Sequence, residues 1–237
     1  MVYETILSKS KNRKIAVLID PDKSHMSSVY KTLEICETCY VDFIMVGGSL
    51  VSNPIDEFVK EIKKTCKLPV ILFPGSLFQI SDAADAILLL SLISGRNPEY
   101  IIGNHVIAAP FLKQSKLEII STGYMLIESG GSTSVQYISN TLPIPTNKPD
   151  IAVATAIAGE MLGLKLIYLE AGSGAIHSVP RDMIELVKKN ISIPLMVGGG
   201  IREREQLEQI FAAGADIAVI GNSLENNPEK LYKLLSK

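Results

Sequence analysis

The chain contains little of what marks the specialised classes of protein. Its 237 residues include no tryptophan, three cysteines and three histidines, and the charged residues balance to a formal net charge of −2. Three cysteines cannot build the disulfide framework of a small secreted domain, and a near-neutral charge gives no general attraction for nucleic acid. The longest apolar stretch, residues 86–93, is shorter than the roughly 18 residues that suggest a membrane span. With an N-terminus that lacks the apolar core of a secretory signal, these absences predict a cytoplasmic protein.

The cysteines and histidines do not indicate a metal site. Cys36 and Cys39 have the spacing of a C-x-x-C motif, but no second ligand pair lies nearby, and the pair ends a helical pattern instead of opening one. Free cysteines are usually buried, so we expect these thiols to be either buried or incidental. His25, His105 and His177 have no partner at ligand spacing, and we assign no metal to histidine.

Strand-like and helix-like segments alternate along the chain, a pattern typical of a parallel sheet with crossover helices. Eight strands are expected, and 237 residues come close to the ~250 of one (β/α)8 barrel. We therefore predict an α/β protein, a (β/α)8 TIM barrel forming a single domain over residues 1–237. Residues 77–85 are too few for a regular helix, so the barrel should be modified around the third crossover. The expected strands are 15–20, 42–46, 70–73, 86–90, 117–126, 166–170, 193–197 and 216–220.

The expected helices follow the strands, apart from the shortened third connection. Residues 129–149 are polar and rich in proline, and we expect them to form a loop or lid. The expected helices are 26–37, 53–66, 98–112, 151–162, 181–189, 203–213 and 228–236.

Two glycine clusters near the C-terminus indicate a phosphate site. Gly198-Gly199-Gly200 follows the strand expected at 193–197, and Gly221-Asn222 follows the strand expected at 216–220. Glycine allows a positive φ and lets backbone N–H groups approach an anion, and a helix N-terminus favours negative charge. In (β/α)8 barrels, phosphate commonly binds to the loops after strands 7 and 8. Plain turns are the alternative, but the paired spacing favours a phosphorylated small molecule as the ligand.

Polar side chains at other strand ends are candidates for chemistry, because the C-terminal ends of barrel strands form the active face. Asp20 ends the first expected strand. Glu170 ends the sixth, and Tyr168, two residues earlier, lies on the same face. Asp22 is more simply explained as a turn or capping residue, and Ser49 could satisfy the backbone of a tight turn.

Taken together, the motifs resemble the geranylgeranylglyceryl phosphate synthase family, and within it the second group, which is related to bacterial heptaprenylglyceryl phosphate synthases. The resemblance covers nearly the whole chain in the expected order. The glycine loops are common to many phosphate-binding barrels, whereas segment 168–174 and the Asn97-Pro98 pair are much more discriminating. The segments that carry it are 18–23 (LIDPDK), 46–49 (VGGS), 73–76 (FPGS), 90–98 (LSLISGRNP), 168–174 (YLEAGSG), 198–201 (GGGI) and 221–222 (GN).

The resemblance implies a Mg²⁺-dependent prenyltransferase that moves a geranylgeranyl or similar group from a prenyl diphosphate to the 3-hydroxyl of sn-glycerol 1-phosphate. It implies that Glu170 and Tyr168 are catalytic. Because the glycerol hydroxyl must lose its proton, Glu170 is the expected general base. The residues implied to bind sn-glycerol 1-phosphate are Tyr168, Leu169, Glu170, Ala171, Gly172, Ser173, Gly174, Gly199, Gly200, Gly221 and Asn222.

Asp20 and Ser49 match the positions that hold Mg²⁺ in the family, and their hard oxygen donors suit that ion. A divalent cation is expected because it neutralises charge that develops on the departing diphosphate. The chain departs from the bacterial heptaprenyl branch at Leu18, where that branch has a lysine. This departure puts one expected phosphate contact in question.

A prenyl chain needs an apolar groove, and the apolar segments around strands 3 to 5 could line one. Tyr100 is the candidate for the residue that closes its far end, with ordinary packing as the alternative. The family further implies a homo-oligomer, dimeric or hexameric, and product release could involve peripheral contact with a membrane. Two other functions stay open on the residues alone: another phosphate-binding barrel enzyme, such as a sugar-phosphate isomerase or lyase, and a non-catalytic barrel that binds glycerol phosphate.

Overall fold

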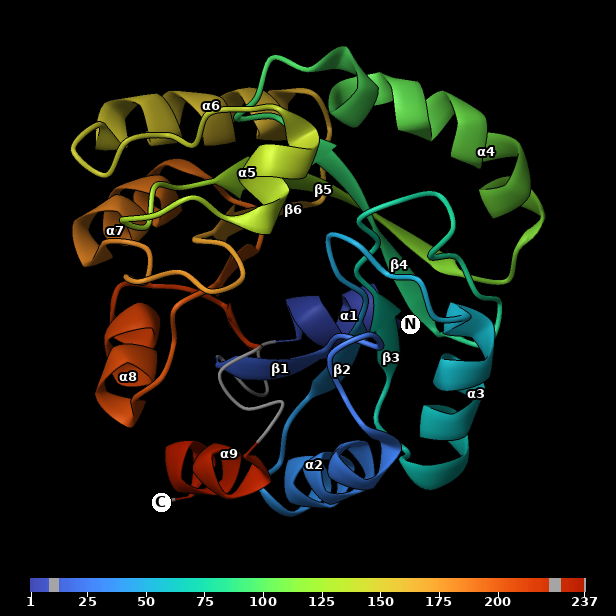
Figure 1. Ribbon diagram of the computed structural model, residues 1–237. Helices are drawn as coiled ribbons and strands as arrows, with labels where there is room; N and C mark the ends of the chain where they lie inside the picture. Colours follow the sequence, from blue (N-terminus) through green and yellow to red (C-terminus); the bar gives the residue numbers. More distant parts are fainter. Residues whose placement is uncertain (9–12, 222–226, 237) are drawn as a thin grey trace.

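Eight parallel strands close into a barrel in the computed structural model, which describes residues 1–8, 13–221 and 227–236 (Figure 1). Each strand pairs with the next in the sequence, and the last pairs with the first. This topology confirms the predicted (β/α)8 TIM barrel. The strands are β1 (Lys14–Ile19), β2 (Phe43–Val46), β3 (Val70–Leu72), β4 (Ala86–Leu92), β5 (Glu118–Leu126), β6 (Leu166–Glu170), β7 (Leu195–Gly198) and β8 (Ile217–Ile220).

Helices cover the outside of the barrel (Figure 1). In one of them, Ile55, Val59 and Ile62 recur at helical spacing and are buried against the strands. Within the described residues, no helix is both long and apolar enough to cross a membrane. The helices are α1 (Val2–Leu7), α2 (Met26–Thr38), α3 (Ile55–Thr65), the π-helix η1 (Glu99–Gly103), α4 (Asn104–Gln114), α5 (Ser134–Ser139), α6 (Pro149–Met161), α7 (Arg181–Asn190), α8 (Arg204–Ala212) and α9 (Pro228–Leu235).

The alternation of side chains along each strand divides the core into two layers. In β6, Leu166 and Tyr168 point into the barrel, whereas Ile167 and Leu169 pack between the barrel and its helices. The outer layer also contains Cys36, which is buried, whereas Cys39 is only half-buried. Side chains fill both layers. A ligand-binding pocket can therefore form only at the ends of the barrel or between its elements.

The third crossover departs from the regular fold, as the sequence predicts. Residues 73–85, all of which are described, form turns and bends with no helix between β3 and β4. The two strands pair only at Ile71–Ala86 and Leu72–Ile87. β4 continues to Leu92 and stays paired with β5 along its whole length. The upper half of β4 therefore has no strand on its β3 side.

The helix α1 was not expected from the sequence. Six residues are too few for a stable isolated helix, so α1 depends on tertiary contacts. Val2 and Ile6 are buried in the inner layer of the barrel. The backbone N–H groups of Val2 and Tyr3, which have no partner within the helix, both donate to the carboxylate of Glu118. α1 thereby covers the end of the barrel at which the strands begin.

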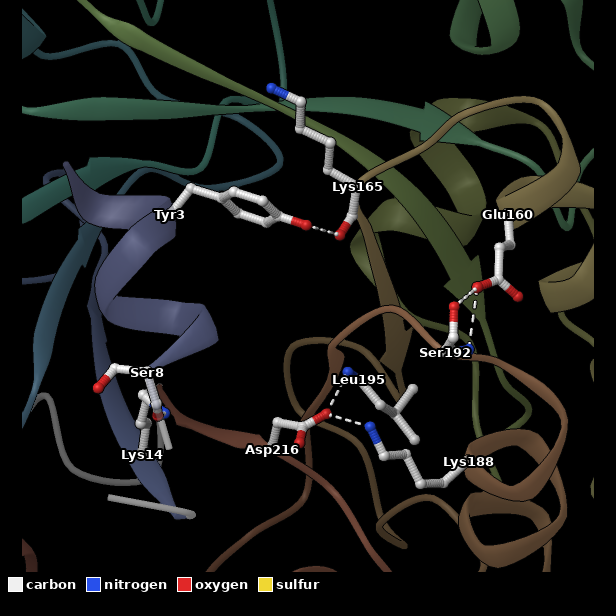
Figure 2. A network of polar contacts seen from close by, with 9 residues as sticks. All are labelled: Tyr3, Ser8, Lys14, Glu160, Lys165, Lys188, Ser192, Leu195 and Asp216. Atoms are coloured by element: carbon white, nitrogen blue, oxygen red, sulfur yellow. Dashed lines mark hydrogen bonds and ion pairs between the residues drawn. The ribbon is translucent and has the colours of Figure 1, made fainter. Parts of the chain in front are cut away.

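Side-chain contacts at the same end fasten α1 to neighbouring segments. Figure 2 shows the Tyr3 hydroxyl donating to the carbonyl oxygen of Lys165, at 2.9 Å. The Lys14 ammonium donates to the carbonyl oxygen of Ser8, the residue that ends α1, at 2.9 Å. These contacts join residues far apart in the sequence, which is why local sequence patterns do not reveal the helix.

The segment expected as a loop or lid, 129–149, contains the short helix α5. The Thr133 hydroxyl accepts the backbone N–H of Gln136 at the start of this helix, and Asn140 ends it in the left-handed conformation at φ 49°. Threonine and asparagine are favoured at these two positions for that reason. The prediction of irregular structure throughout the segment was therefore wrong for Ser134–Ser139.

The role of Glu118 predicts a stability effect. Glu118→Leu keeps the bulk of the side chain but removes both acceptors for the first turn of α1. We expect the free energy of unfolding, measured by chemical denaturation, to fall by about 1–3 kcal/mol, the range for buried groups that lose a partner.

Glu208→Leu is the matched control. Glu208 pairs with Arg13 at 2.8 Å, and both side chains are about half exposed, so its loss should change the free energy of unfolding by about 0–1 kcal/mol. Equal effects of the two substitutions would show that Glu118 does not anchor α1.

Candidate active site

A polar pocket lies at the end of the barrel where the strands finish. The loops after β1, β2, β6, β7 and β8 line it, which is where barrel enzymes place their active sites. The structure brings most of the predicted site residues together here. Those that line the pocket are Asp20, Ser49, Tyr168, Glu170, Gly172, Ser173, Gly174, Gly199, Gly200 and Gly221.

Three of the predicted residues are not among those that line this pocket. Leu169 and Ala171 are fully buried in the outer layer of the core, because strand alternation directs them away from the face that Tyr168 and Glu170 share. Their side chains therefore do not contribute to the pocket. Asn222 lies outside the described residues.

Glu170 is a buried carboxylate at the end of β6. It is 6% exposed, and its Oε1 atom accepts the backbone N–H of Gly172 at 2.6 Å. Burial raises the pKa of this carboxyl above its usual range, because the charged form loses water, while the nearby Tyr168 hydroxyl and the Gly172 N–H act in the opposite direction. A carboxylate with a raised pKa is suited to accept a proton near neutral pH.

Glycine is required beside this carboxylate. A Cβ atom at Gly199 would lie 2.5 Å from Glu170 Oε1, and the backbone there has a φ of 84°, which side chains rarely adopt. Gly199 therefore lets the loop after β7 pass directly over Glu170. The next residue, Gly200, also has a positive φ, of 71°.

Tyr168 lies beneath Glu170, within a group of three aromatic rings. Its ring centroid is 5.5 Å from that of Tyr124 and 5.6 Å from that of Phe73, and such tilted and edge contacts are favourable. Its hydroxyl is buried and has no hydrogen-bond partner within normal geometry. Burial, together with the negative charge of Glu170, raises the pKa of Tyr168 well above its usual value. The hydroxyl is therefore held neutral and is able to donate a hydrogen bond.

Asp20 and Ser49, the predicted Mg²⁺ ligands, line the same pocket. The Asp20 carboxylate is almost fully buried, pairs with the Lys23 ammonium at 2.7 Å and accepts the N–H of Asp22 at 3.0 Å. A Cβ atom at Gly48 would lie 2.7 Å from Asp20 Oδ2, so this glycine leaves the carboxylate its space. Mg²⁺ is commonly held by one or two carboxylates together with water and substrate phosphate. One carboxylate and one hydroxyl beside an open pocket fit such an ion.

Two cationic side chains in the pocket were not assigned a role from the sequence. Lys23 and Arg202 both line it. The Arg202 guanidinium donates to the carbonyl oxygen of Ala175 at 2.6 Å and so joins the loop after β7 to the loop after β6. Lys23 is the last residue of the LIDPDK segment and Arg202 directly follows GGGI, and these positions are the signal that sequence reasoning could have used.

An apolar cleft adjoins the polar pocket. Both are lined by Gly48, Ser49, Phe73, Tyr124 and Val135, so the two lie side by side and share these residues. The cleft lies around β3, β4 and α4, where β4 has lost its neighbouring strand. The other apolar side chains that line it are Leu77, Ile80, Ile87, Leu89, Leu90, Leu92, Ala108, Leu112 and Ile138.

Tyr100 also lines the apolar cleft, in η1. Its hydroxyl lies 3.5 Å from the carbonyl oxygen of Ile138, so the ring stands between η1 and α5. The cleft is also lined by Leu112, twelve residues farther along and about three helical turns away. Tyr100 is thus a wall of the cleft, and whether it sets the length of a bound chain stays a prediction.

The buried Glu170 predicts an unusual dependence of stability on pH. Because its folded pKa is raised, Glu170 favours the folded state only below its unfolded pKa, and that contribution is lost as the pH rises through the folded pKa. Glu170→Gln removes the charge but keeps an acceptor for the Gly172 N–H. We expect it to raise the free energy of unfolding at about pH 8, with a smaller gain at about pH 4.

Glu160→Gln is the control and should have the opposite sign. Hydrogen bonds from the hydroxyl and backbone N–H of Ser192 lower the pKa of Glu160 (Figure 2). That carboxylate therefore favours the folded state above its unfolded pKa, and the contribution is lost as the pH falls. The measurement is chemical denaturation of each variant at both pH values. If Glu170→Gln were less stable than the wild type at about pH 8, the buried charge of Glu170 would not destabilise the folded state.

The fold of the chain matches those of two archaeal proteins of known structure, one of them closely. The structure of (S)-3-O-geranylgeranylglyceryl phosphate synthase from Thermoplasma acidophilum, in complex with sn-glycerol-1-phosphate, matches with a TM-score of 0.93 and 36% identity over 99% of this chain and 97% of the other. Orotidine 5′-monophosphate decarboxylase from Methanocaldococcus jannaschii matches with a TM-score of 0.61 and 18% identity over 95% and 99% of the two chains. The second likeness shows the shared barrel fold alone.

Sequence comparison gives relatives from bacteria and archaea. The geranylgeranylglyceryl phosphate synthase of Chitinophaga pinensis is 50% identical over 236 residues, which cover 98% of this chain and 94% of the relative. The protein of the same name from Pyrococcus furiosus is 46% identical over 218 residues, covering 91% and 86%. The PcrB family model matches residues 8–237. These matches confirm the resemblance seen in the motifs, and the chain belongs to the PcrB family.

Proposed function

We propose that the protein transfers a geranylgeranyl or similar prenyl group from a prenyl diphosphate to the 3-hydroxyl of sn-glycerol 1-phosphate, with Mg²⁺ as cofactor. The observation that carries the proposal is that a polar pocket and an apolar cleft lie side by side and share five lining residues. A phosphorylated acceptor and an apolar donor would meet where the two adjoin, beside Ser49 and Tyr124. The names of the relatives support the same reaction.

The acceptor end suits a small phosphate ester. Gly199, Gly200 and Gly221 bring two loops to the pocket edge, where backbone N–H groups can face an anion. Leu18 lines the pocket beside Gly221, at the position where part of the family has lysine. We therefore propose that the backbone of the glycine loops supplies the main contacts to phosphate.

The chemistry requires one base and one leaving group. The oxygen of the acceptor hydroxyl forms a bond to C1 of the prenyl chain, while the bond from C1 to diphosphate breaks and diphosphate leaves with the electron pair. The hydroxyl proton passes to the carboxylate of Glu170, because burial raises the pKa of this carboxyl and makes it a stronger base. The neutral Tyr168 hydroxyl beneath it is able to stabilise and orient that carboxylate.

The donor end suits a diphosphate joined to a long apolar chain. Asp20 and Ser49 would hold Mg²⁺, which neutralises negative charge on the diphosphate when bound. The Lys23 ammonium, partly exposed beside Asp20, adds positive charge at the same place. The apolar side chains of β4, α4 and the β3–β4 connection would then bury the prenyl chain, at roughly 25 cal/mol for each Å² removed from water.

Specific observations disfavour the two other functions considered. A sugar-phosphate isomerase or lyase would need the polar pocket, but its small polar substrate would not occupy the apolar cleft beside it. A non-catalytic glycerol phosphate sensor would not need a buried carboxylate with a raised pKa, which weakens the folded state at neutral pH.

The decisive experiment is a transfer assay. Radiolabelled sn-glycerol 1-phosphate is incubated with prenyl diphosphates of several lengths, and product is extracted into organic solvent. Glu170→Gln should lower turnover by about 10² or more, the scale of a lost general base, with binding of sn-glycerol 1-phosphate retained. Glu160→Gln, on the protein surface, should keep full turnover. A Glu170→Gln variant with more than about half the wild-type rate would exclude Glu170 as the base.

The metal requirement has its own test. Chelation with EDTA should abolish product formation, and added Mg²⁺ should restore it, because the diphosphate needs charge neutralisation to leave. Asp20→Asn should stay inactive at Mg²⁺ levels that saturate the wild type. Full activity of the wild-type protein in the presence of EDTA would remove Mg²⁺ from the reaction.

A further inference from the structure

A buried glutamine holds the loop that carries Ser49. Gln79 lies in the connection between β3 and β4 and is only 1% exposed. Its Nε2 donates to the carbonyl oxygen of Gly48 at 2.8 Å, and its Oε1 accepts the N–H of Gly48 at 3.2 Å. Both polar groups of the amide are thus used on the backbone of one residue.

This arrangement replaces strand pairing that the fold does not supply. β2 and β3 pair as far as Val46 and Leu72, and one more backbone bond joins Phe73 to Val46, at 2.8 Å. Beyond that point none of the strands in the described part of the chain pairs with Gly48. Since an unpaired buried backbone group is costly, the side chain of Gln79 takes the place of a neighbouring strand.

The same connection touches the Ser49 loop at two further points. A Cβ atom at Gly75 would clash with the carbonyl oxygen of Gly48 and lie 2.8 Å from the Cα atom of Ser49. A Cβ atom at Gly47 would clash with the carbonyl oxygen of Phe73. The two segments are therefore packed backbone to backbone, and the position of Ser49 depends on the connection.

The connection also forms one wall of the apolar cleft. Leu77 and Ile80, two residues before and one residue after Gln79, both line it. Gly48 itself lies against the Asp20 carboxylate. Gln79 thus stands between the wall of the apolar cleft and the pair Asp20 and Ser49, although it is not among the residues that line either cavity.

We propose that Gln79 is a positioning residue for the donor substrate: it fixes the Gly48 peptide so that Ser49 is held where the diphosphate and its metal bind. The inference rests on the proposed function. The loops expected to bind sn-glycerol 1-phosphate follow β6, β7 and β8, and none of the hydrogen bonds of the Gln79 side chain reaches them. Although Ser49 also lines the pocket that contains these loops, loss of the Gln79 hydrogen bonds should therefore affect the donor far more than the acceptor.

The test compares the binding of the two substrates in the absence of turnover. Gln79→Met keeps a side chain of similar length and removes both hydrogen bonds to Gly48. Binding is measured by calorimetry with a non-reactive thiodiphosphate analogue of the C20 donor in Mg²⁺, and separately with sn-glycerol 1-phosphate. Ser81→Ala is the matched control, because Ser81 is buried in the same connection but bonds to Asp56 of α3, at 2.6 Å.

We expect the affinity for the donor analogue to fall by about tenfold or more, as buried backbone groups lose their partners. Affinity for sn-glycerol 1-phosphate should change by less than about twofold, because its loops share no partner with Gln79. Ser81→Ala should alter neither affinity. Gln79→Ala, which leaves room for water beside the Gly48 peptide, should give the same selective loss if the methionine variant does not fold.

Equal losses of both affinities, or an unchanged donor affinity in a folded variant, would overturn the positioning role. A matching loss in Ser81→Ala would also overturn it, since the effect would then reflect general loosening of the connection. Failure of the wild-type protein to bind the donor analogue would instead refute the proposed function itself. The wild-type measurement therefore tests the proposed function, and the variants test the role of Gln79.

Discussion

The structure depends on one constraint: an eight-stranded parallel barrel is filled by its own side chains. Aromatic rings of Phe73, Tyr124 and Tyr168 occupy the interior directly below the pocket, so a long ligand cannot enter the barrel. It must lie across the rim or leave sideways between two elements. The short pairing of β3 with β4, and the absence of a helix from residues 73–85, provide that exit. The apolar cleft is therefore a consequence of the shortened third crossover.

The same packing sets the electrostatics of the site. Glu170 is buried above the aromatic rings, with Gly199 close over it, and this loss of water raises its pKa. Asp20, also buried, has the ammonium of Lys23 at 2.7 Å to balance its charge. Two acids in one pocket are thus placed in different environments, one without a cationic partner and suited to accept a proton, the other beside an ammonium group.

The sequence predicts those features that depend on local pattern. Strand alternation placed Tyr168 and Glu170 on one face, and the small number of residues between the third and fourth strands predicted the shortened crossover. Both hold in the structure. Features that depend on distant partners were missed. α1 exists because Glu118, more than a hundred residues away, accepts its first N–H groups. Gln79 looks like an ordinary polar loop residue until Gly48 is placed beside it.

The general barrel fold explains the polar pocket better than it explains the apolar cleft. Glycine loops after β7 and β8 are a common feature of phosphate-binding barrels, and barrels as distant as 18% identity share the architecture that carries them. The apolar cleft arises where this chain departs from the regular fold. A connection without a helix lies there, and its residues line the cleft and hydrogen-bond to the Gly48 peptide. Selection of the donor should therefore reside in residues 73–112, and recognition of phosphate in the last third of the chain.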